Sequence, residues 1–588
     1  MIRPHEIDPQ SFVDPELAPP PEPASTGEAA GELAPVRRDD WRLVLVMFVF
    51  LLAYGALAAK MAMAALGDPA EPSHAAGLHP ETPVRGAITD RAGRLLAANL
   101  PAWALYADPR EIRDPAAAAD ALAPIFPRLG RDELYRRLSA KRKFVWVHRP
   151  VTPRQKAAVM DLKPAIPGLK FGRRDMRVYP AGRMAAHLVG GTKYGSEGVN
   201  AAELIGTAGA EFHFDERLRD PALRDTPLPL SIDLGVQAAL TEILQRGIEH
   251  TSAKGAAGIL LDIRSSEILA LVSLPDFNPN SEVRSVAGGE DNPRFNRAIK
   301  GVYELGSVFK PITAAIALDA GIAGPETMIE TGTPVRFGRQ RIRDMHAMPA
   351  AMTVTDIVRR SSNIGAARLA RAVGTRRFRD YLDRLGMLEP LPLEIGEAAS
   401  ARPMLPPNWT ELSTLTISFG HGLAVSPLHL TAAFATIANG GRLVVPTLMK
   451  GGRAPGEQVF SERTSAQMLD MLRAVVKRGT GRRTDVEGYA VGGKTGTADK
   501  ARADGRGYHH DRVLASFASV FPVTNPRYAM LIMLDEPTDP ESGKREASRT
   551  AVPVTAEAIR RLAPMLGLRP ELPPVLPPQG TEARRALR

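Results

Sequence analysis

Tyr303-Glu-Leu-Gly-Ser-Val-Phe-Lys-Pro311 is the stretch of this 588-residue chain on which its fold and chemistry depend. Ser307 follows a glycine and precedes a strongly apolar run over 312–318. Because proline is tolerated only near the start of a helix, Pro311 places Ser307 in or beside the first helical turn. Positions i and i+3 share a helix face, so the Lys310 amine can reach the Ser307 hydroxyl.

The scarcity of lysine adds weight to Lys310, which is the only lysine between Lys300 and Lys450. An apolar site lowers the pKa of a lysine and makes its neutral amine available as a general base. The stretch therefore predicts a serine nucleophile activated by a neighbouring lysine. A Ser-x-x-Lys match alone carries little weight in a chain of this length.

Two further stretches add polar groups that such a site needs. Ser361-Ser-Asn363 precedes a predicted helix and places a hydroxyl and a carboxamide two residues apart. Lys494-Thr-Gly-Thr497 contributes a lysine and two hydroxyls that can receive a carboxylate, and a glycine that permits close approach of a substrate. The order Ser-x-x-Lys, Ser-x-Asn, Lys-Thr-Gly is the signature of penicillin-binding proteins and serine β-lactamases.

Apolar runs at a distance from these motifs predict a sheet built from both ends of one domain. The runs 258–263 and 268–274 flank a polar turn, and the runs 513–521 and 528–534 flank another, so each pair is typical of a strand hairpin. A strand over 229–233 is predicted to precede the first helix. The patterns between the hairpins are mostly helical, which indicates an α+β domain.

Composition limits the classes of protein to which the chain can belong. Hydrophobic residues make up 44% and charged residues 24%, which excludes wholesale disorder, collagen-like repetition and a polytopic membrane protein. Cysteine is absent, so disulfides, thiolate metal sites and a cysteine nucleophile are excluded as well.

An apolar segment near the N-terminus predicts a membrane anchor over 43–66, because residues 43–59 contain no charged side chain. An arginine cluster within 37–42 precedes the segment and only Lys60 lies near its other end, so the positive-inside rule keeps the N-terminus in the cytoplasm. A cleaved signal peptide is the alternative, but the preceding residues are more numerous than a usual charged leader. We expect an uncleaved single-pass anchor in the cell inner membrane, with the catalytic part periplasmic.

The net charge of +10 is unevenly distributed: the first 42 residues carry four Arg against nine Asp and Glu, so the remainder carries +15. The densest basic cluster, 141–146, interleaves bases with aromatics as nucleic-acid-binding surfaces do. However, Phe144-Val-Trp-Val147 alternates like a half-buried strand. Outside the membrane we expect no nucleic-acid partner, and the charge suits an anionic surface or substrate.

Beyond the three motifs, the chain resembles a class B penicillin-binding protein, a membrane-anchored peptidoglycan D,D-transpeptidase, over about residues 40–565. Arg85-Gly-x-x-x-Asp-Arg-x-Gly93, Arg177-x-Tyr-Pro-x-Gly182 and Gly206-x-x-Gly209-x-Glu211 resemble the non-catalytic pedestal of that family. None of the three is expected in a β-lactamase.

Two stretches, 419–427 and Ser361–Gly365, resemble the division-specific (FtsI-type) branch of the family more than the elongation branch. Leu305 stands where many members have proline, outside the catalytic positions. The resemblance implies the α+β fold of serine β-lactamases and penicillin-binding transpeptidases, a mainly antiparallel sheet with helices on both faces. An elongated α+β pedestal and one N-terminal transmembrane helix precede it. The chain is predicted to have five parts. They are a disordered cytoplasmic tail (1–42), the anchor (43–66), the pedestal (dimerisation-type) domain (67–227), the transpeptidase domain (228–567) and a Pro-rich tail (568–588).

The resemblance also assigns roles to the motif residues. Ser307 attacks the carbonyl between the terminal D-alanines of a donor stem pentapeptide, and Lys310 takes its proton. Ser361 relays a proton to the leaving amine, and Lys494 tunes the site. The expected substrate-binding residues, for the peptide amide and the terminal carboxylate, are Asn363, Thr495, Gly496 and Thr497. The backbone N–H groups of Ser307 and Thr497 form the expected oxyanion hole.

The implied partners are stem peptides, β-lactams and membrane proteins of division. An amine from a neighbouring stem resolves the ester, and β-lactams trap Ser307 by mimicking the D-Ala-D-Ala end. No metal or cofactor is required. The chain lacks the extra length of a fused glycosyltransferase, so a separate membrane glycan polymerase and other division proteins are expected. The alternatives are an elongation-type transpeptidase, a membrane-anchored β-lactamase, a β-lactam sensor and a catalytically inactive division scaffold.

Overall fold

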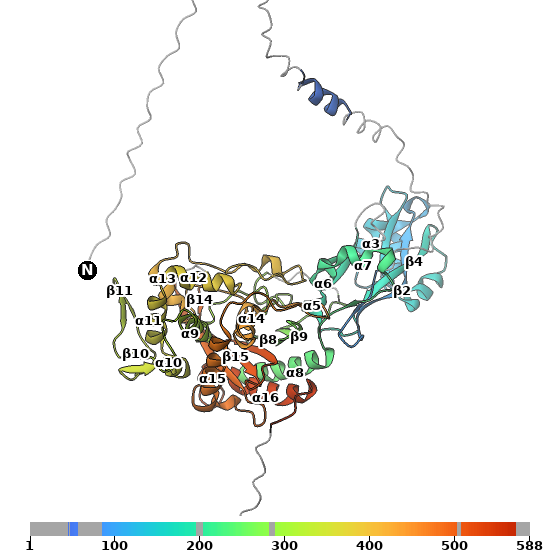
Figure 1. Cartoon of the computed structure of the whole chain (residues 1–588). Helices are drawn as coiled ribbons and strands as arrows, with labels where there is room; N and C mark the ends of the chain where they lie inside the picture. The colour runs from blue at the N-terminus through green and yellow to red at the C-terminus, as the bar shows by residue number, and fades with distance from the viewer. Residues whose placement is uncertain are drawn as a thin grey trace, which may run out of the picture. The chain divides into compact units, whose positions relative to one another are not determined.

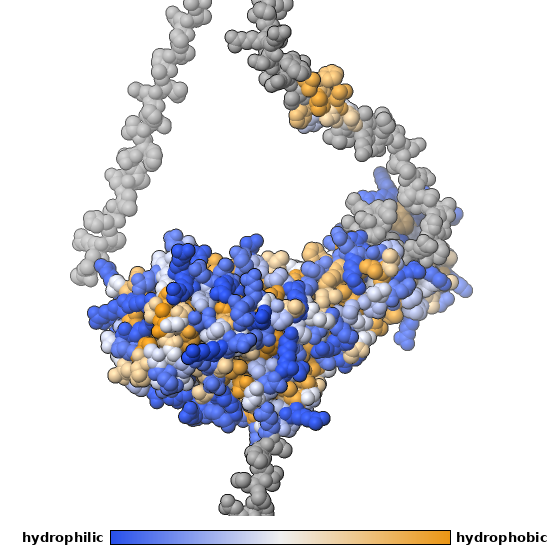
Figure 2. Space-filling model, viewed as in Figure 1, coloured by the Kyte–Doolittle hydropathy of each residue, from blue (hydrophilic) through white to orange (hydrophobic). Residues whose placement is uncertain are grey.

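The computed structural model describes residues 45, 47–56, 85–195, 204–281, 288–502 and 507–571, which belong to two compact units, 1–77 and 78–588. In the first unit the described residues are helical, and each of their large apolar side chains is more than half exposed (Figure 2). Among all described residues, no helix is both long and apolar enough to cross a membrane. The predicted tail 1–42, most of the predicted anchor and residues 572–588 lie outside the described residues.

The first part of the second unit is an α+β region built around β2 (Leu95–Ala107), a long strand that pairs antiparallel with three others (Figure 1). Its partners are β1 (Ile88–Thr89), β3 (Val145–Val151) and β4 (Leu169–Val178). Three short helices share a buried core with β2 and β3, namely α2 (Pro115–Leu122), α3 (Arg131–Leu138) and α4 (Pro153–Met160). The expected strand after Phe144 is therefore present as β3.

The three pedestal-type stretches meet in one buried ion-pair network. The carboxylate of Glu211 accepts from Arg85 Nε and from Arg177 Nε, both at 2.6 Å. Arg85 also donates to Asp215 at 2.7 Å, and Arg177 donates to Asn99 at 2.9 Å. The side chains of Glu211, Arg85 and Arg177 are at most 2% exposed, so their charges are removed from water and depend on one another.

We expect Glu211→Gln to lower the free energy of unfolding by about 3–5 kcal/mol, because it removes the carboxylate that pairs with the buried Arg177 and leaves the buried Arg85 with Asp215 as its remaining partner. Urea unfolding of the purified protein measures the effect. Glu133→Gln is the matched control, since its carboxylate pairs with arginines at the surface and exposed pairs contribute about 1 kcal/mol or less. Equal losses in the two variants would contradict a stabilising role for the buried network.

The remainder of the second unit is built on a five-stranded antiparallel sheet in the order β14-β15-β16-β8-β9. These strands are β8 (Gly255–Asp262), β9 (Ile268–Leu274), β14 (Gly492–Ala501), β15 (Tyr508–Phe521) and β16 (Tyr528–Asp535). Both predicted hairpins are present, and β16 pairs with β8, with Tyr528 opposite Asp262. The prediction of one sheet that joins distant segments is confirmed.

Helices cover both faces of this sheet (Figure 1), which explains why β8, β9 and β16 are buried along their whole length and almost entirely apolar. On β16, Met530 and Ile532 pack with α8 (Leu234–Thr251) and α16 (Ala551–Met565) in one core. Leu531, between them on the strand, points to the opposite face of the sheet and belongs to a second core. The helices contributing to that core include α9 (Lys310–Asp319), α14 (Pro427–Ala438) and α15 (Glu462–Arg478).

The predicted strand over 229–233 is wrong in its extent. Only β7 (Leu228–Pro229) forms, and it pairs in parallel with β1. Asp233 instead caps α8, because its side chain accepts hydrogen bonds from the backbone N–H groups of Gly235 and Val236. An aspartate that was interpreted as the end of a strand is thus the beginning of a helix.

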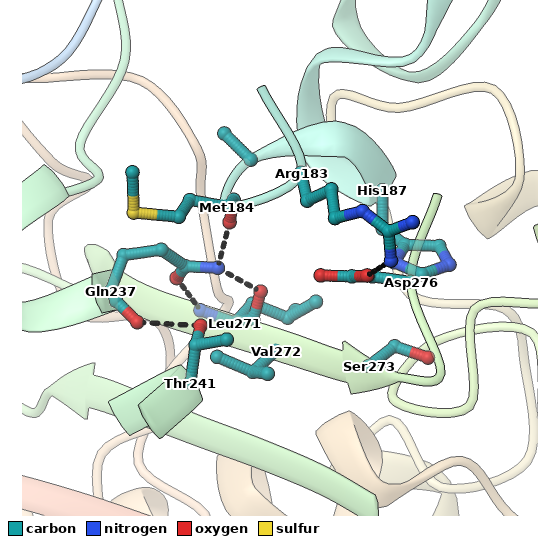
Figure 3. A pocket seen from close by; sticks show the side chains of 10 residues that line it. Arg183, Met184, His187, Gln237, Thr241, Leu271, Val272, Ser273 and Asp276 are labelled. Atoms are coloured by element: carbon teal, nitrogen blue, oxygen red, sulfur yellow. Dashed lines mark hydrogen bonds and ion pairs between the residues drawn. The ribbon is translucent and has the colours of Figure 1, made fainter. Parts of the chain in front are cut away.

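Hydrogen bonds from Gln237 join the two parts of this unit beside the edge of β9 (Figure 3). The Gln237 Nε2 atom donates to the carbonyls of Met184 and Leu271, both at 2.8 Å, and its Oε1 accepts from Leu271 N at 2.8 Å. Arg183 pairs with Asp276 at 3.0 Å beside them. These groups line a cavity of about 10 Å³, close to the least space that can hold one water, and close the free edge of β9.

Candidate active site

Ser307 lies in a single 3-10 turn, η4 (Gly306–Phe309), immediately before α9, as the position of Pro311 predicted. Gly306 has a φ of +62°, and a Cβ there would lie 3.0 Å from the carbonyl oxygen of Thr497 on β14. Glycine therefore lets the serine turn reverse direction and lie directly against the strand that carries the Lys-Thr-Gly motif.

The amine of Lys310 connects the first two motifs. Its Nζ lies 2.9 Å from Ser307 Oγ, 2.6 Å from the carbonyl oxygen of Ser361 and 3.0 Å from Ser361 Oγ. A neutral amine has two N–H groups and one lone pair, so it can donate to both Ser361 oxygens and accept from the Ser307 hydroxyl. This arrangement is that of a base ready to take the serine proton.

Burial lowers the pKa of Lys310 well below its usual range, and the charge of Lys494 lowers it further, while the Asp344 carboxylate acts in the opposite direction. Burial also lowers the pKa of Lys494, to about 7. Both amines lie 3.0 Å from Ser361 Oγ. Because the charge on Lys494 favours a neutral Lys310, we assign the proton of the pair to Lys494.

Ser361 adopts the left-handed conformation, with a φ of 68°, where α10 (Val354–Arg360) ends and before α11 (Asn363–Val373) begins. This conformation is unfavourable for a residue with a side chain, by about 1–3 kcal/mol. It places the hydroxyl and the carbonyl of one residue within hydrogen-bond distance of Lys310. The strained backbone thus presents two acceptors to the amine.

Asp344 holds the Ser-x-Asn motif in place, a role that the sequence did not predict. Its carboxylate accepts from the Ser362 hydroxyl at 2.7 Å, from Ile364 N at 3.2 Å and from Asn363 N. The Asn363 side chain donates to the carbonyl of Arg343 at 3.1 Å. The carboxylate therefore caps the start of α11 and fixes the backbone around the predicted substrate-binding amide.

We expect Asp344→Asn to slow acylation by a penicillin about tenfold, because the amide keeps one acceptor but loses the charge-assisted bonds that hold Ser362 and Asn363. The rate is measured from the growth of a fluorescent penicillin adduct at subsaturating concentration. Asp356→Asn serves as the control, since Asp356 pairs with Arg359 on α10. A wild-type rate in Asp344→Asn would exclude a positioning role.

The Lys-Thr-Gly motif lies on β14, at the edge of the sheet. Lys494 donates to Ser361 Oγ at 3.0 Å and to the Thr495 carbonyl at 2.9 Å. The Thr495 and Thr480 hydroxyls are 2.7 Å apart, and Thr497 Oγ1 accepts from Ala547 N at 3.0 Å. The Thr497 hydroxyl can still donate its proton to a substrate carboxylate.

Gly496 packs closely against the serine stretch. A Cβ at this position would lie 2.7 Å from the carbonyl oxygen of Leu305 and 2.9 Å from a side-chain carbon of Val308. The serine stretch therefore fills the side of the strand toward which a Cβ would point, and the expected role of Gly496 in substrate binding stays a prediction. Glycine is therefore required here so that β14 and the turn can pack together.

Glu304 and His421 make contacts beside the serine turn. Glu304 accepts from Gly422 N at 2.8 Å and from the Tyr508 hydroxyl at 2.7 Å. The His421 ring lies between the rings of Phe419 and Tyr508, with centroids at 5.3 and 5.8 Å. Tyr508, like Asp344, was not predicted from the sequence.

Ser307, Lys310, Ser361 and Lys494 thus form one hydrogen-bonded path, although they come from three separate stretches. Within the described ranges, no group of three or more histidine and acidic side chains is placed to hold a metal ion. The backbone N–H groups of Ser307 and Thr497 belong to segments that touch at Gly306, and their role as an oxyanion hole stays a prediction.

Family comparison agrees with this geometry. Residues 256–559 match the penicillin binding protein transpeptidase domain, and residues 80–221 match the penicillin-binding protein dimerisation domain. The chain belongs to the penicillin-binding protein transpeptidase family. The predicted boundary at residue 228 lies between the two matched ranges.

Curated relatives of this transpeptidase-family chain identify its branch. It is 38% identical over 498 residues to the probable peptidoglycan D,D-transpeptidase FtsI of Caulobacter vibrioides, with 82% of each chain covered. It is 31% identical to the peptidoglycan D,D-transpeptidase FtsI of Escherichia coli K12, over 80% of this chain and 82% of the relative. The resemblance to division-specific class B proteins is therefore confirmed.

Solved structures of penicillin-binding proteins share the fold. Penicillin-binding protein 3 of Mycobacterium tuberculosis, complexed with aztreonam, matches with a TM-score of 0.63 at 23% identity, over 84% of this chain and 98% of that one. The transpeptidase domain of Burkholderia pseudomallei penicillin-binding protein 3 matches with a TM-score of 0.52 at 32% identity, over 59% of this chain and 98% of that one. The predicted transpeptidase fold is confirmed.

Proposed function

We propose that this chain is a serine D,D-transpeptidase that crosslinks peptidoglycan stem peptides at the division septum and is inactivated by β-lactams. The observation that carries the proposal is the path from Ser307 Oγ through Lys310 Nζ and Ser361 Oγ to Lys494 Nζ. It joins a nucleophile, a base and a proton relay in the order that acyl transfer requires.

In acylation, Lys310 takes the hydroxyl proton while Ser307 Oγ attacks the carbonyl between the terminal D-alanines. The proton passes through Ser361 to the leaving amine, and D-alanine departs as the ester forms. Thr495 and Thr497 hold the terminal carboxylate, and Asn363 binds the donor's peptide amide. Backbone donors at the oxyanion contribute about 3–4 kcal/mol each in comparable enzymes.

In the second half of the reaction, an amine of a neighbouring stem attacks the ester carbonyl. The same relay removes a proton from the amine and returns one to Ser307 Oγ, so a new peptide bond replaces the ester. We expect water to hydrolyse the acyl-enzyme ester slowly. The two carboxylates beside the site, Glu304 and Asp344, already accept hydrogen bonds from N–H or hydroxyl donors, so neither is free to act as a base toward water.

We also propose that residues 43–66 anchor the chain in the cell inner membrane and leave the catalytic part outside the cytoplasm. The uncharged run 43–59, its arginine-rich N-terminal flank and the exposed apolar helix within 47–56 support this placement. The same proposal includes partnership with a separate membrane glycan polymerase and other division proteins, because an enzyme that crosslinks stems acts on strands that a polymerase has made.

Stoichiometric labelling tests the proposed activity. Wild-type protein is expected to bind one fluorescent penicillin per chain, to turn over nitrocefin slowly, and to form crosslinked stem dimers from uncrosslinked glycan strands. Rapid nitrocefin hydrolysis without crosslinking would instead identify a β-lactamase. If the protein showed neither labelling nor crosslinking, the proposed activity would be refuted in favour of a catalytically inactive scaffold.

A further inference from the structure

A small hairpin beside the active site carries four exposed arginines. It consists of β11 (Val335–Phe337) and β12 (Gln340–Ile342), which pair antiparallel with Arg336 opposite Arg341. The inward side chains, among them Val335, share a small core with α11 and Phe419. The four exposed arginines of the hairpin and its flank are Arg336, Arg339, Arg341 and Arg343.

These arginines lack counter-charges of their own. Within the part of the chain that the structure describes, no ion pair joins any of the four to a carboxylate. The carboxylates near the hairpin are engaged elsewhere: Glu330 pairs with Arg368, and Glu411 pairs with Arg371. Like charges directly opposite each other destabilise a strand pair, so the facing Arg336 and Arg341 are unfavourable for the free hairpin.

The arginine-bearing face is continuous with the predicted substrate site. The carbonyl of Arg343 accepts from the Asn363 side chain at 3.1 Å, and the next residue, Asp344, caps the start of α11. The carbonyl of Arg336 accepts from Arg371 on α11 at 3.2 Å. Figure 2 shows a largely hydrophilic surface on the side of the molecule where Figure 1 labels β11.

We propose that this exposed hairpin face binds carboxylates of a peptidoglycan strand while one stem of that strand occupies the active site. The inference rests on the proposed transpeptidase function and extends it to the recognition of polymer. Each unreacted stem peptide ends in a free carboxylate, so a polymerised strand presents a row of negative charges. The charge on the hairpin matches this row, and binding relieves the repulsion between Arg336 and Arg341.

The double variant Arg336→Gln/Arg341→Gln tests the proposal in the full-length protein. Its KM for uncrosslinked glycan strands bearing pentapeptide stems is expected to rise about fivefold at low salt, with kcat nearly unchanged. High salt is expected to raise the wild-type KM and to reduce the difference between the proteins. The rate of acylation by penicillin should stay at the wild-type value, because that small probe carries no neighbouring stem peptides for the hairpin to bind.

Two controls isolate the electrostatic effect. Arg336→Lys/Arg341→Lys retains the charge and is expected to restore most of the wild-type KM. Arg560→Gln/Arg569→Gln removes the same charge from exposed positions on and just after α16, and its KM should equal that of the wild type. Thermal unfolding of the glutamine variant should occur at or slightly above the wild-type temperature, because a repulsive pair is lost.

An unchanged KM in a normally acylated Arg336→Gln/Arg341→Gln protein would overturn the proposal and leave the transpeptidase function intact. If penicillin failed to acylate the wild-type protein, the proposed function itself would be refuted. Vesicles of phosphatidylglycerol serve as a competing probe. If the glutamine variant lost vesicle binding while its KM stayed unchanged, the hairpin would face anionic lipid and the strand proposal would be wrong.

Discussion

Alanine in place of Ser307 is expected to abolish covalent labelling by fluorescent penicillin and all crosslinking. Ser307 Oγ lies 2.9 Å from the amine assigned as its base, and alanine supplies no other nucleophile at that position. The fold should survive, because Lys310 keeps both of its contacts with Ser361. Labelling is read from the fluorescent band and from the mass of the intact protein.

Ser400→Ala is a suitable control for Ser307→Ala, since Ser400 is exposed and donates only to a neighbouring carbonyl. It should label fully. Thermal unfolding shows whether the Ser307 variant is folded, and unlabelled penicillin should still protect it slightly against heat by non-covalent binding. If the folded Ser307→Ala protein were still labelled, another residue would have to be the nucleophile, and the assignment of Ser307 would be refuted.

The strands of the catalytic sheet could be predicted because each is an apolar run bounded by a polar turn. The pairing of β16 with β8 followed from the order of elements, since a single sheet has to bury both hairpins. The sequence could not show where the strand that begins near residue 229 ends, because Asp233 is equally suited to a turn and to a helix cap. Tertiary contacts decide between them.

The motif residues of the site were predictable because each motif is local. Asp344 was missed because it contacts Ser362 from 18 residues away, and the local N-cap of α11 is Ser362 itself. Tyr508 was missed for a similar reason, since it reaches Glu304 across 204 residues. The packing of Gly496 against the serine stretch was missed, because the sequence does not show what fills the space beside a glycine.

Methionine in place of Lys310 is expected to lower the rate of acylation by penicillin about 10²–10⁴-fold, the usual contribution of a general base. Methionine fills the buried space without a charge, and the Ser307 hydroxyl remains but loses its proton acceptor. The rate is measured by stopped-flow or by timed gel labelling. Lys300→Met, at an exposed position before the serine stretch, is the control and should acylate normally. Normal acylation by folded Lys310→Met would remove the lysine from the base role.

The pH profile distinguishes a base from a residue that only fills space. A base acts when it is neutral, so wild-type acylation should rise with pH through the pKa of Lys310 and reach its plateau below the usual lysine range. The positive charge of Lys494 contributes to that low pKa. Lys494→Met should therefore raise the pKa of Lys310 and move the acidic limb of the profile to higher pH, besides lowering the plateau. In Lys310→Met the limb should disappear. An acidic limb that stays in place in both variants would assign it to another group and contradict the neutral-lysine mechanism.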